Sequence, residues 1–275
     1  MPEPSNPLDL DLKARLRQYL PVLFEFLDVE DFEPDQWQKL TSNFTDRYLK
    51  RKAEYEANNN HLIVERDIYD VIIGKLNGEL PATMFLDFIK KALEELADRL
   101  TNDEKKLIIK TLYGFLISDD FKFANYFGEL LVLNSITKSN NFTLKSVESS
   151  IIGDLTADFL FEHVNSKEIE LIEVVNLHID ETHTNLVKHL TKKYRRKLKD
   201  KRGGATNYNK FMLIPVIWAS FADLQRVLDI YESGAINKMP YVFEPVAYSS
   251  TTGPDGEIIY KFGTISTLLD RSLGK

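Results

Sequence analysis

The chain has 275 residues, with 35 basic and 42 acidic side chains, no cysteine and 43% hydrophobic residues. The lack of cysteine excludes disulfides and thiolate metal sites. The composition is that of a globular chain that can bury a core in one large or two small domains. No apolar run approaches the ~18 residues of a membrane span, and the sequence does not open on a secretory leader pattern. We therefore expect a cytoplasmic protein without membrane contact.

The first half of the sequence has the periodicity of helices. Apolar residues at helical spacing predict helices over residues 8–20, 36–58, 62–76 and 81–100. Thr101 and Glu104 then form a capping-box pattern ahead of a further apolar helix over 107–116. We expect residues 1–118 to form an all-α domain that docks a partner or regulates the second half.

From about residue 141 the pattern changes to short apolar runs that alternate with amphipathic segments. Strands are predicted over 142–147, 155–161, 169–177 and 211–218, helices over 181–199 and 219–231, and a terminal hairpin over 241–249 and 257–262. The predicted fold class is α+β, with an α/β domain over 119–275 built on a central mixed sheet.

Three carboxylates interrupt apolar segments of this second half or of the helix before it. Glu173 lies in the strand LIEVVNL, on the same face as Leu171 and Val175 if the side chains alternate; Asp158 interrupts TADFLF, and Glu129 lies in YFGELLVL. A charged group inside a buried strand needs a partner, a metal or an opening to solvent. Three carboxylates that meet at one end of a sheet would bind a hard cation such as Mg²⁺ or Mn²⁺. Such an ion can activate water and stabilise charge on a phosphodiester.

At this point the sequence resembles the PD-(D/E)xK, or restriction-endonuclease-like, nuclease superfamily over about residues 120–218. The resemblance comprises a helix with Gly128 and Glu129, a hairpin with Asp158 on its second strand, a third strand with Glu173, a basic helix and a fourth strand. It implies that Asp158 and Glu173 are metal ligands, helped by the carbonyl of Val174, and that Glu129 completes the shell. It also implies cleavage of DNA, a restriction-endonuclease-like core, and a role in antiviral defence beside a helicase or ATPase.

The sequence departs from the family pattern at Val175, where the family has the lysine that positions the attacking water. One explanation is that the following helix supplies this ammonium group. With Leu190 at the centre of the apolar stripe of that helix, Lys193 falls about 60° and Lys197 about 20° away, so both can reach inward. We assign Lys193 to the catalytic group. The other explanation is that the site is inactive.

A strongly basic segment runs from Lys188 to Arg202, with nine bases and one acid. Such a local charge excess within an acidic protein indicates contact with a polyanion or with an acidic protein surface. The residues predicted to bind nucleic acid are Lys188, Lys192, Arg195, Arg196, Lys197 and Lys199. Asn176 and His178 lie on the strand face opposite Glu173 and are expected to serve sheet packing.

Two functions follow from the sequence. The first is a metal-dependent nuclease, or nuclease-like subunit, acting on DNA in a bacterial phage-defence or restriction system. The second is a catalytically inactive interaction or scaffold subunit, which docks a partner protein or a nucleic acid through its basic helix.

Overall fold

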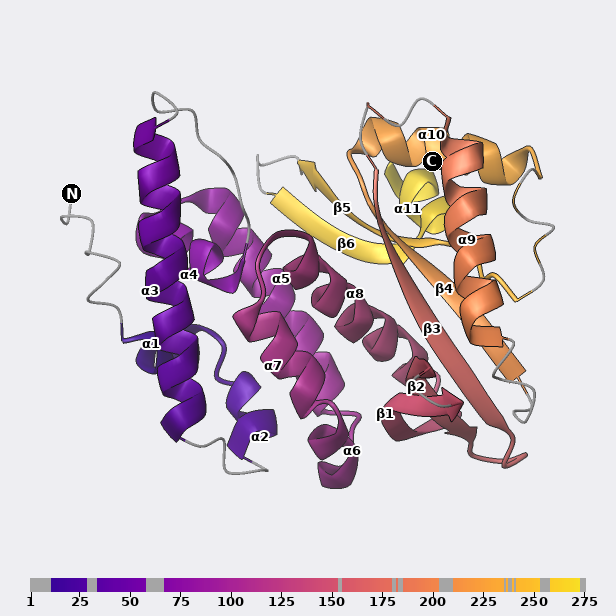
Figure 1. The fold of residues 1–275 in the computed structure, drawn as a ribbon, viewed down its shortest axis with the longest axis horizontal. Helices are drawn as coiled ribbons and strands as arrows, with labels where there is room; N and C mark the ends of the chain where they lie inside the picture. Colours follow the sequence, from indigo (N-terminus) through magenta and orange to yellow (C-terminus); the bar gives the residue numbers. More distant parts are fainter. Residues whose placement is uncertain are drawn as a thin grey trace. The chain divides into compact units, whose positions relative to one another are not determined.

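The computed structural model describes residues 11–28, 34–57, 67–152, 155–179, 182, 185–202, 210–234, 236, 239, 241–252 and 258–272. Within these residues the protein is mixed α+β, with eleven helices and one open six-stranded mixed sheet (Figure 1). The chain divides into two compact units, Met1–Leu130 and Leu131–Lys275. The boundary between these units follows Leu130 and lies inside a helix, whereas the sequence predicts a boundary between residues 118 and 119. None of the described helices is both long and apolar enough to span a membrane.

The first unit contains only helices among its described residues, as predicted. The helices are α1 (Leu12–Tyr19), α2 (Leu23–Leu27), α3 (Pro34–Ala57), α4 (Ile68–Leu76), α5 (Leu80–Ala97), α6 (Asn102–Leu107), α7 (Ile109–Ile117) and α8 (Asp120–Thr137), the last of which continues into the second unit. The capping box is confirmed, because the Thr101 hydroxyl accepts from the Glu104 amide and the Glu104 carboxylate accepts from the Thr101 amide. The predicted 107–116 helix is interrupted near its start, since α6 ends at Leu107 and α7 begins at Ile109.

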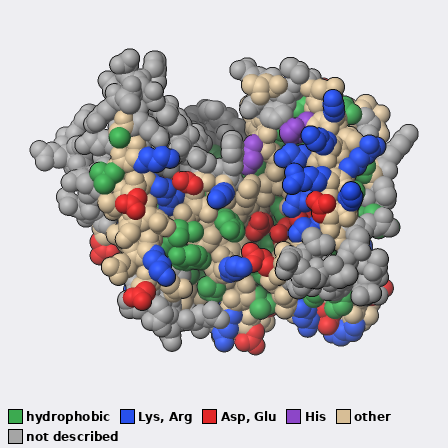
Figure 2. Space-filling view, in the orientation of Figure 1, with side chains coloured by type: hydrophobic (Ala, Val, Ile, Leu, Met, Phe, Trp, Pro, Cys, Tyr) green, Lys and Arg blue, Asp and Glu red, His purple; other side chains and the backbone are tan. Residues whose placement is uncertain are grey.

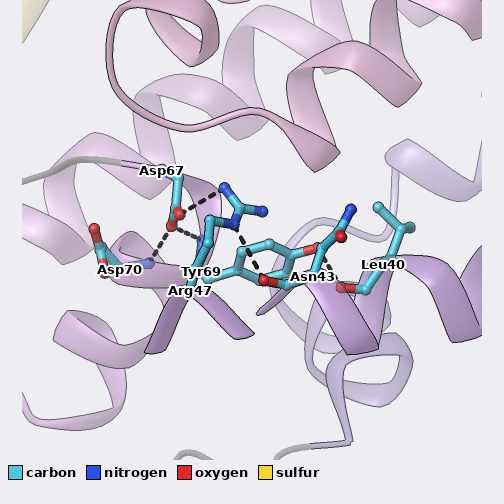
Figure 3. Close-up of polar contacts among 6 residues, drawn as sticks. All are labelled: Leu40, Asn43, Arg47, Asp67, Tyr69 and Asp70. Atoms are coloured by element: carbon cyan, nitrogen blue, oxygen red, sulfur yellow. Dashed lines mark hydrogen bonds and ion pairs between the residues drawn. The ribbon is translucent and has the colours of Figure 1, made fainter. Parts of the chain in front are cut away.

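A buried polar network joins α3 to the start of α4 in this unit (Figure 3). One oxygen of Asp67 accepts from the amides of Tyr69 and Asp70, at 2.9 Å each, and caps α4. Its other oxygen lies 2.9 Å from the Arg47 guanidinium, which also lies over the ring of Tyr69, 5.0 Å from its centroid. The Tyr69 hydroxyl donates to the carbonyl of Leu40. Asp67 therefore caps α4 with one oxygen and, with the other, forms an ion pair to Arg47 of α3.

The second unit is built on the sheet. Its strands are β1 (Phe142–Ile152), β2 (Leu155–His163), β3 (Ile169–His178), β4 (Lys210–Trp218), β5 (Val246–Thr252) and β6 (Ile258–Thr264), in that spatial order. β1, β2 and β3 pair antiparallel, β3, β4 and β5 pair parallel, and β5 and β6 form the antiparallel hairpin that the sequence predicts. The parallel connections run through α9 (Leu186–Arg202) and α10 (Phe221–Glu232), and α11 (Ile265–Ser272) follows β6.

The two faces of β3 have different neighbours. Leu171, Val175 and Leu177 belong to a core with side chains of α9, α10 and α11, which cover one face of the sheet (Figure 1). Glu170 and Ile172 alternate with them and lie on the other face, towards the end of α8. Glu173 shares the α9 face, as the alternation predicts.

Candidate active site on strands β2 and β3

Asp158 lies where β2 and β3 stop pairing. The antiparallel ladder between these strands extends from the Glu162–Ile169 pair to the Phe159–Ile172 pair. Just beyond its end, the amide of Val174 donates to Oδ2 of Asp158 at 2.6 Å. The Asp158 side chain thus accepts the hydrogen bond that a carbonyl of the neighbouring strand would otherwise accept from Val174. This bond fixes the Asp158 carboxylate beside β3.

Glu173 lies on β3 next to this bond, and its side chain is completely buried. Nζ of Lys197 lies 2.6 Å from Oε1, and Nζ of Lys201 lies 3.4 Å from Oε2. Lys201 also donates to the backbone carbonyl of Thr156 on β2. Two lysines of α9 therefore neutralise a buried carboxylate, and Lys201 fastens the end of α9 to both diverging strands.

The two carboxylates influence each other electrostatically. The pKa of Asp158 is raised from 3.8 to about 7, and the largest cause is that its carboxyl group is removed from water, although part of the residue is exposed. The negative charge of Glu173 is the second cause that raises this pKa, whereas the Val174 amide and the ammonium groups of Lys197 and Lys201 lower it. A carboxyl group of this kind exchanges a proton near neutral pH, which is a property of many acid–base sites.

Lys193 lies one turn before Lys197 on α9, and it is exposed. No ion pair with Glu173 involves it among the described residues. Its charge acts instead on His178, at the other end of β3, where burial and then Lys193 lower the pKa of the imidazole to about 4. α9 returns along β3 in the opposite direction, so residues later in the helix lie beside residues earlier in the strand. The structure thus brings Lys197 and Lys201 to Glu173, and brings Lys193 towards His178.

The other bases of α9 form an exposed surface. Figure 2 shows Lys and Arg side chains gathered over this helix. The exposed members are Lys188, Lys192, Lys193, Arg195, Arg196 and Lys199. Of these, Arg196 lies 3.9 Å from Asp200, an exposed pair of small energetic weight. Lys197, predicted to belong to this set, is turned towards Glu173.

Glu129 is half-buried in α8 and belongs to the first unit. Among the described residues, no group of three or more His, Asp or Glu side chains is arranged to hold a metal. Two carboxylates nevertheless suffice for Mg²⁺, which keeps several waters and takes further oxygens from a phosphate substrate. Oε2 of Glu173 accepts no hydrogen bond in the described part of the chain, and its ion-pair partner there is Nζ of Lys201, 3.4 Å away. Asp158 and Glu173 are therefore the two carboxylates that would hold such an ion.

Sequence reasoning missed two contributors to this site. One is Lys201, which falls about 20° from Leu190 on the helical wheel and so shares the inward stripe with Lys197; the predicted helix ended at residue 199, before it. The other is the amide of Val174, whose bond to Asp158 depends on where the ladder ends. Asn176 and His178 serve packing as expected, since Asn176 accepts from the indole of Trp218 and His178 stacks on its ring.

Comparisons of this chain with models of protein families, with curated proteins and with solved structures found no match.

Proposed function

We propose that this protein is a metal-dependent nuclease, or the nuclease-like subunit of an assembly, that acts on DNA through Asp158 and Glu173. The observation that carries the proposal is the juxtaposition of these two carboxylates on adjacent strands, with two lysines of the next helix at Glu173. A pair of acids with a nearby ammonium group is the set that the PD-(D/E)xK resemblance requires.

The topology of the second unit supports the resemblance. The order helix, three antiparallel strands, helix and parallel strand, from α8 to β4, is the order expected for a restriction-endonuclease-like core. Both acids lie where β2 and β3 diverge, so one end of the hairpin carries the candidate site.

Asp158 and Glu173 would hold Mg²⁺ or Mn²⁺, which when bound would activate water and stabilise charge on a phosphodiester. Lys197 would take the role of the lysine that Val175 replaces, because its ammonium group already lies against Glu173 and its side chain is 40% exposed. Lys201, which is only 15% exposed and bound to the strand backbone, would position Glu173.

The exposed bases of α9 would hold the phosphate backbone of the DNA. Contacts of this kind give affinity without sequence preference and weaken steeply with salt. A helicase or ATPase partner, and a place in phage defence, belong to the proposal through the resemblance alone.

The test incubates the full chain with plasmid and with single-stranded DNA, in the presence of Mg²⁺, Mn²⁺ or EDTA. Asp158→Asn and Glu173→Gln should each abolish metal-dependent cleavage. The matched control is Glu162→Gln, which removes a carboxylate from β2 whose partners, Lys145 and Lys167, are exposed. Cleavage that persists in both carboxylate variants would overturn the proposal.

One observation favours the second function, an inactive interaction or scaffold subunit. Both oxygens of Glu173 have ammonium partners, Lys197 and Lys201, as in a structural ion pair. If this function holds, the protein binds no Mg²⁺ in a calorimetric titration, and Asp158→Asn does not change its association with DNA or protein partners.

A further inference from the structure

The face of the sheet opposite α9 carries a pocket of about 300 Å³. The end of α8, the start of β1, strands β3 to β6 and the segment before β5 line it, and all the lining residues belong to the second unit. Most of them are apolar, among them Phe142, Ile172, Met212, Ile214, Phe243 and Phe262. A largely apolar cavity of this size, with few polar groups, is typical of a site for a small organic molecule.

One of the few polar side chains that line this pocket is Glu170 of β3, which is 4% exposed. Its Oε1 lies 2.9 Å from Nζ of Lys210, the residue opposite it on β4. Its Oε2 is buried and has no hydrogen-bond partner in the described part of the chain. A buried carboxylate oxygen without a donor is costly, because it has lost its water and gained no replacement.

We propose that this pocket binds a small amphipathic amine. The amine donates an N–H to the carboxylate of Glu170, and an aromatic body lies against the phenylalanine rings. A carboxylate accepts from two ammonium groups at once, so Lys210 and the ligand share Glu170. The apolar lining explains why the ligand needs a hydrophobic body, and the buried carboxylate of Glu170 explains why it needs a donor group. The site lies on the opposite face of β3 from Glu173 and does not depend on nuclease activity.

The test uses ¹⁹F NMR of two probe molecules of the same shape with the full-chain protein. 4-Fluorophenethylamine carries the amine, and 4-fluoroethylbenzene lacks it. We expect the amine to bind at least about tenfold more tightly than the hydrocarbon, since only the amine forms a charge-assisted hydrogen bond. Equal affinity of the two compounds, or no line broadening of the amine at millimolar concentration, would overturn the proposal.

Two variants locate the binding. Glu170→Gln keeps the size of the side chain and should weaken the amine about tenfold or more. Ser135→Phe introduces a ring from an exposed lining position on α8 and should abolish binding without removing any core contact. The control Glu168→Gln removes the same charge from an exposed residue just before β3 and should bind the amine as the unmodified protein does. Wild-type affinity in either Glu170→Gln or Ser135→Phe would place the amine elsewhere and refute the assignment.

Discussion

Lys197 reaches Glu173 from the helix that follows the strand, with 2.6 Å between its Nζ and Oε1 of the carboxylate. The residue two positions after Glu173 on the same strand face is Val175, which is buried in the core against α9. Val175 therefore serves packing, and the ammonium group that contacts Glu173 comes from Lys197 of α9. We therefore expect Lys197, and not Lys193, to be the lysine that the proposed activity needs.

Replacing Lys197 by Ala should lower metal-dependent cleavage by about 10²-fold or more, the usual effect of losing a group that assists proton transfer. Lys193→Ala should stay within a few-fold of the unmodified protein, because Lys193 forms no ion pair with Glu173. The measurement is the single-turnover rate of plasmid cleavage at saturating Mg²⁺. The two variants remove the same charge from adjacent turns of α9, so each is the control of the other, and a larger loss in Lys193→Ala would reject the assignment.

The exposed bases of α9 should set the salt dependence of DNA binding. Replacing Lys192, Arg195, Arg196 and Lys199 by Ala removes four exposed positive charges. The slope of log K against log [salt] should then fall in magnitude by up to about 4, since each lost phosphate contact removes about 0.9. Fluorescence anisotropy with duplexes of unrelated sequence should show the same weakening for each. An unchanged slope would assign this surface to protein docking.

The imidazole of His178 should make stability fall in mild acid. Its pKa is about 4 in the folded protein, because of burial and then Lys193, and near 6.5 when the chain is unfolded. Well above pH 6.5 the imidazole is neutral in both the folded and the unfolded state. Between pH 6.5 and 4 only the unfolded state takes up the proton, so the free energy of unfolding decreases as the pH falls. Solvent around the half-buried ring keeps the slope below the ~1.4 kcal/mol per pH unit of a full proton.

The check is urea unfolding between pH 4 and 7 with His178→Phe, which keeps a ring against Trp218 but cannot be protonated. Its stability should depend less on pH over this range than that of the unmodified protein. Lys193→Ala should raise the pKa of His178, as seen by NMR titration of the imidazole. A His178 that titrates near 6.5 in the folded protein would contradict the prediction.

Much of the fold can be predicted from local sequence patterns, whereas the candidate site can be predicted from them only in part. The strands with Asp158, Glu173 and Trp218 were predicted, and the structure places them side by side as β2, β3 and β4. Each is an apolar run bounded by polar residues, so its burial is visible in the sequence. α11 was missed because it follows β6 directly, without a break in the chain that would separate helix from strand.

The site was harder to predict because its geometry depends on tertiary register. The helical wheel selected the inward stripe of α9 correctly, and this stripe includes Lys197. Which turn of the helix lies beside Glu173 depends on the length of the connection from β3 and on the direction of α9, and neither has a local signal. The wheel places Lys197 nearer to the centre of the stripe than Lys193, and our assignment of Lys193 did not follow that ranking.

Asp67 should contribute more to the stability of the helical unit than an ordinary cap. It is 1% exposed, caps α4 and pairs with Arg47, whose side chain is only 13% exposed (Figure 3). Asp67→Ala removes both interactions and leaves a largely buried guanidinium without this partner, so a loss of ~2–4 kcal/mol is expected. Asp11→Ala is the matched control, because Asp11 also caps a helix, through the amide of Ala14, but is exposed. It should cost ~1 kcal/mol or less.

The two tryptophans allow this prediction to be measured in the correct unit, since Trp37 lies in the helical unit and Trp218 in the sheet. In a Trp218→Phe background, urea unfolding followed by fluorescence reports on Trp37, which is buried and stacked on Phe24. Asp67→Ala should shift that transition to lower urea, well beyond the shift caused by Asp11→Ala. Equal shifts in the two variants would show that Asp67 acts only as a cap, and that the ion pair with Arg47 adds no stability.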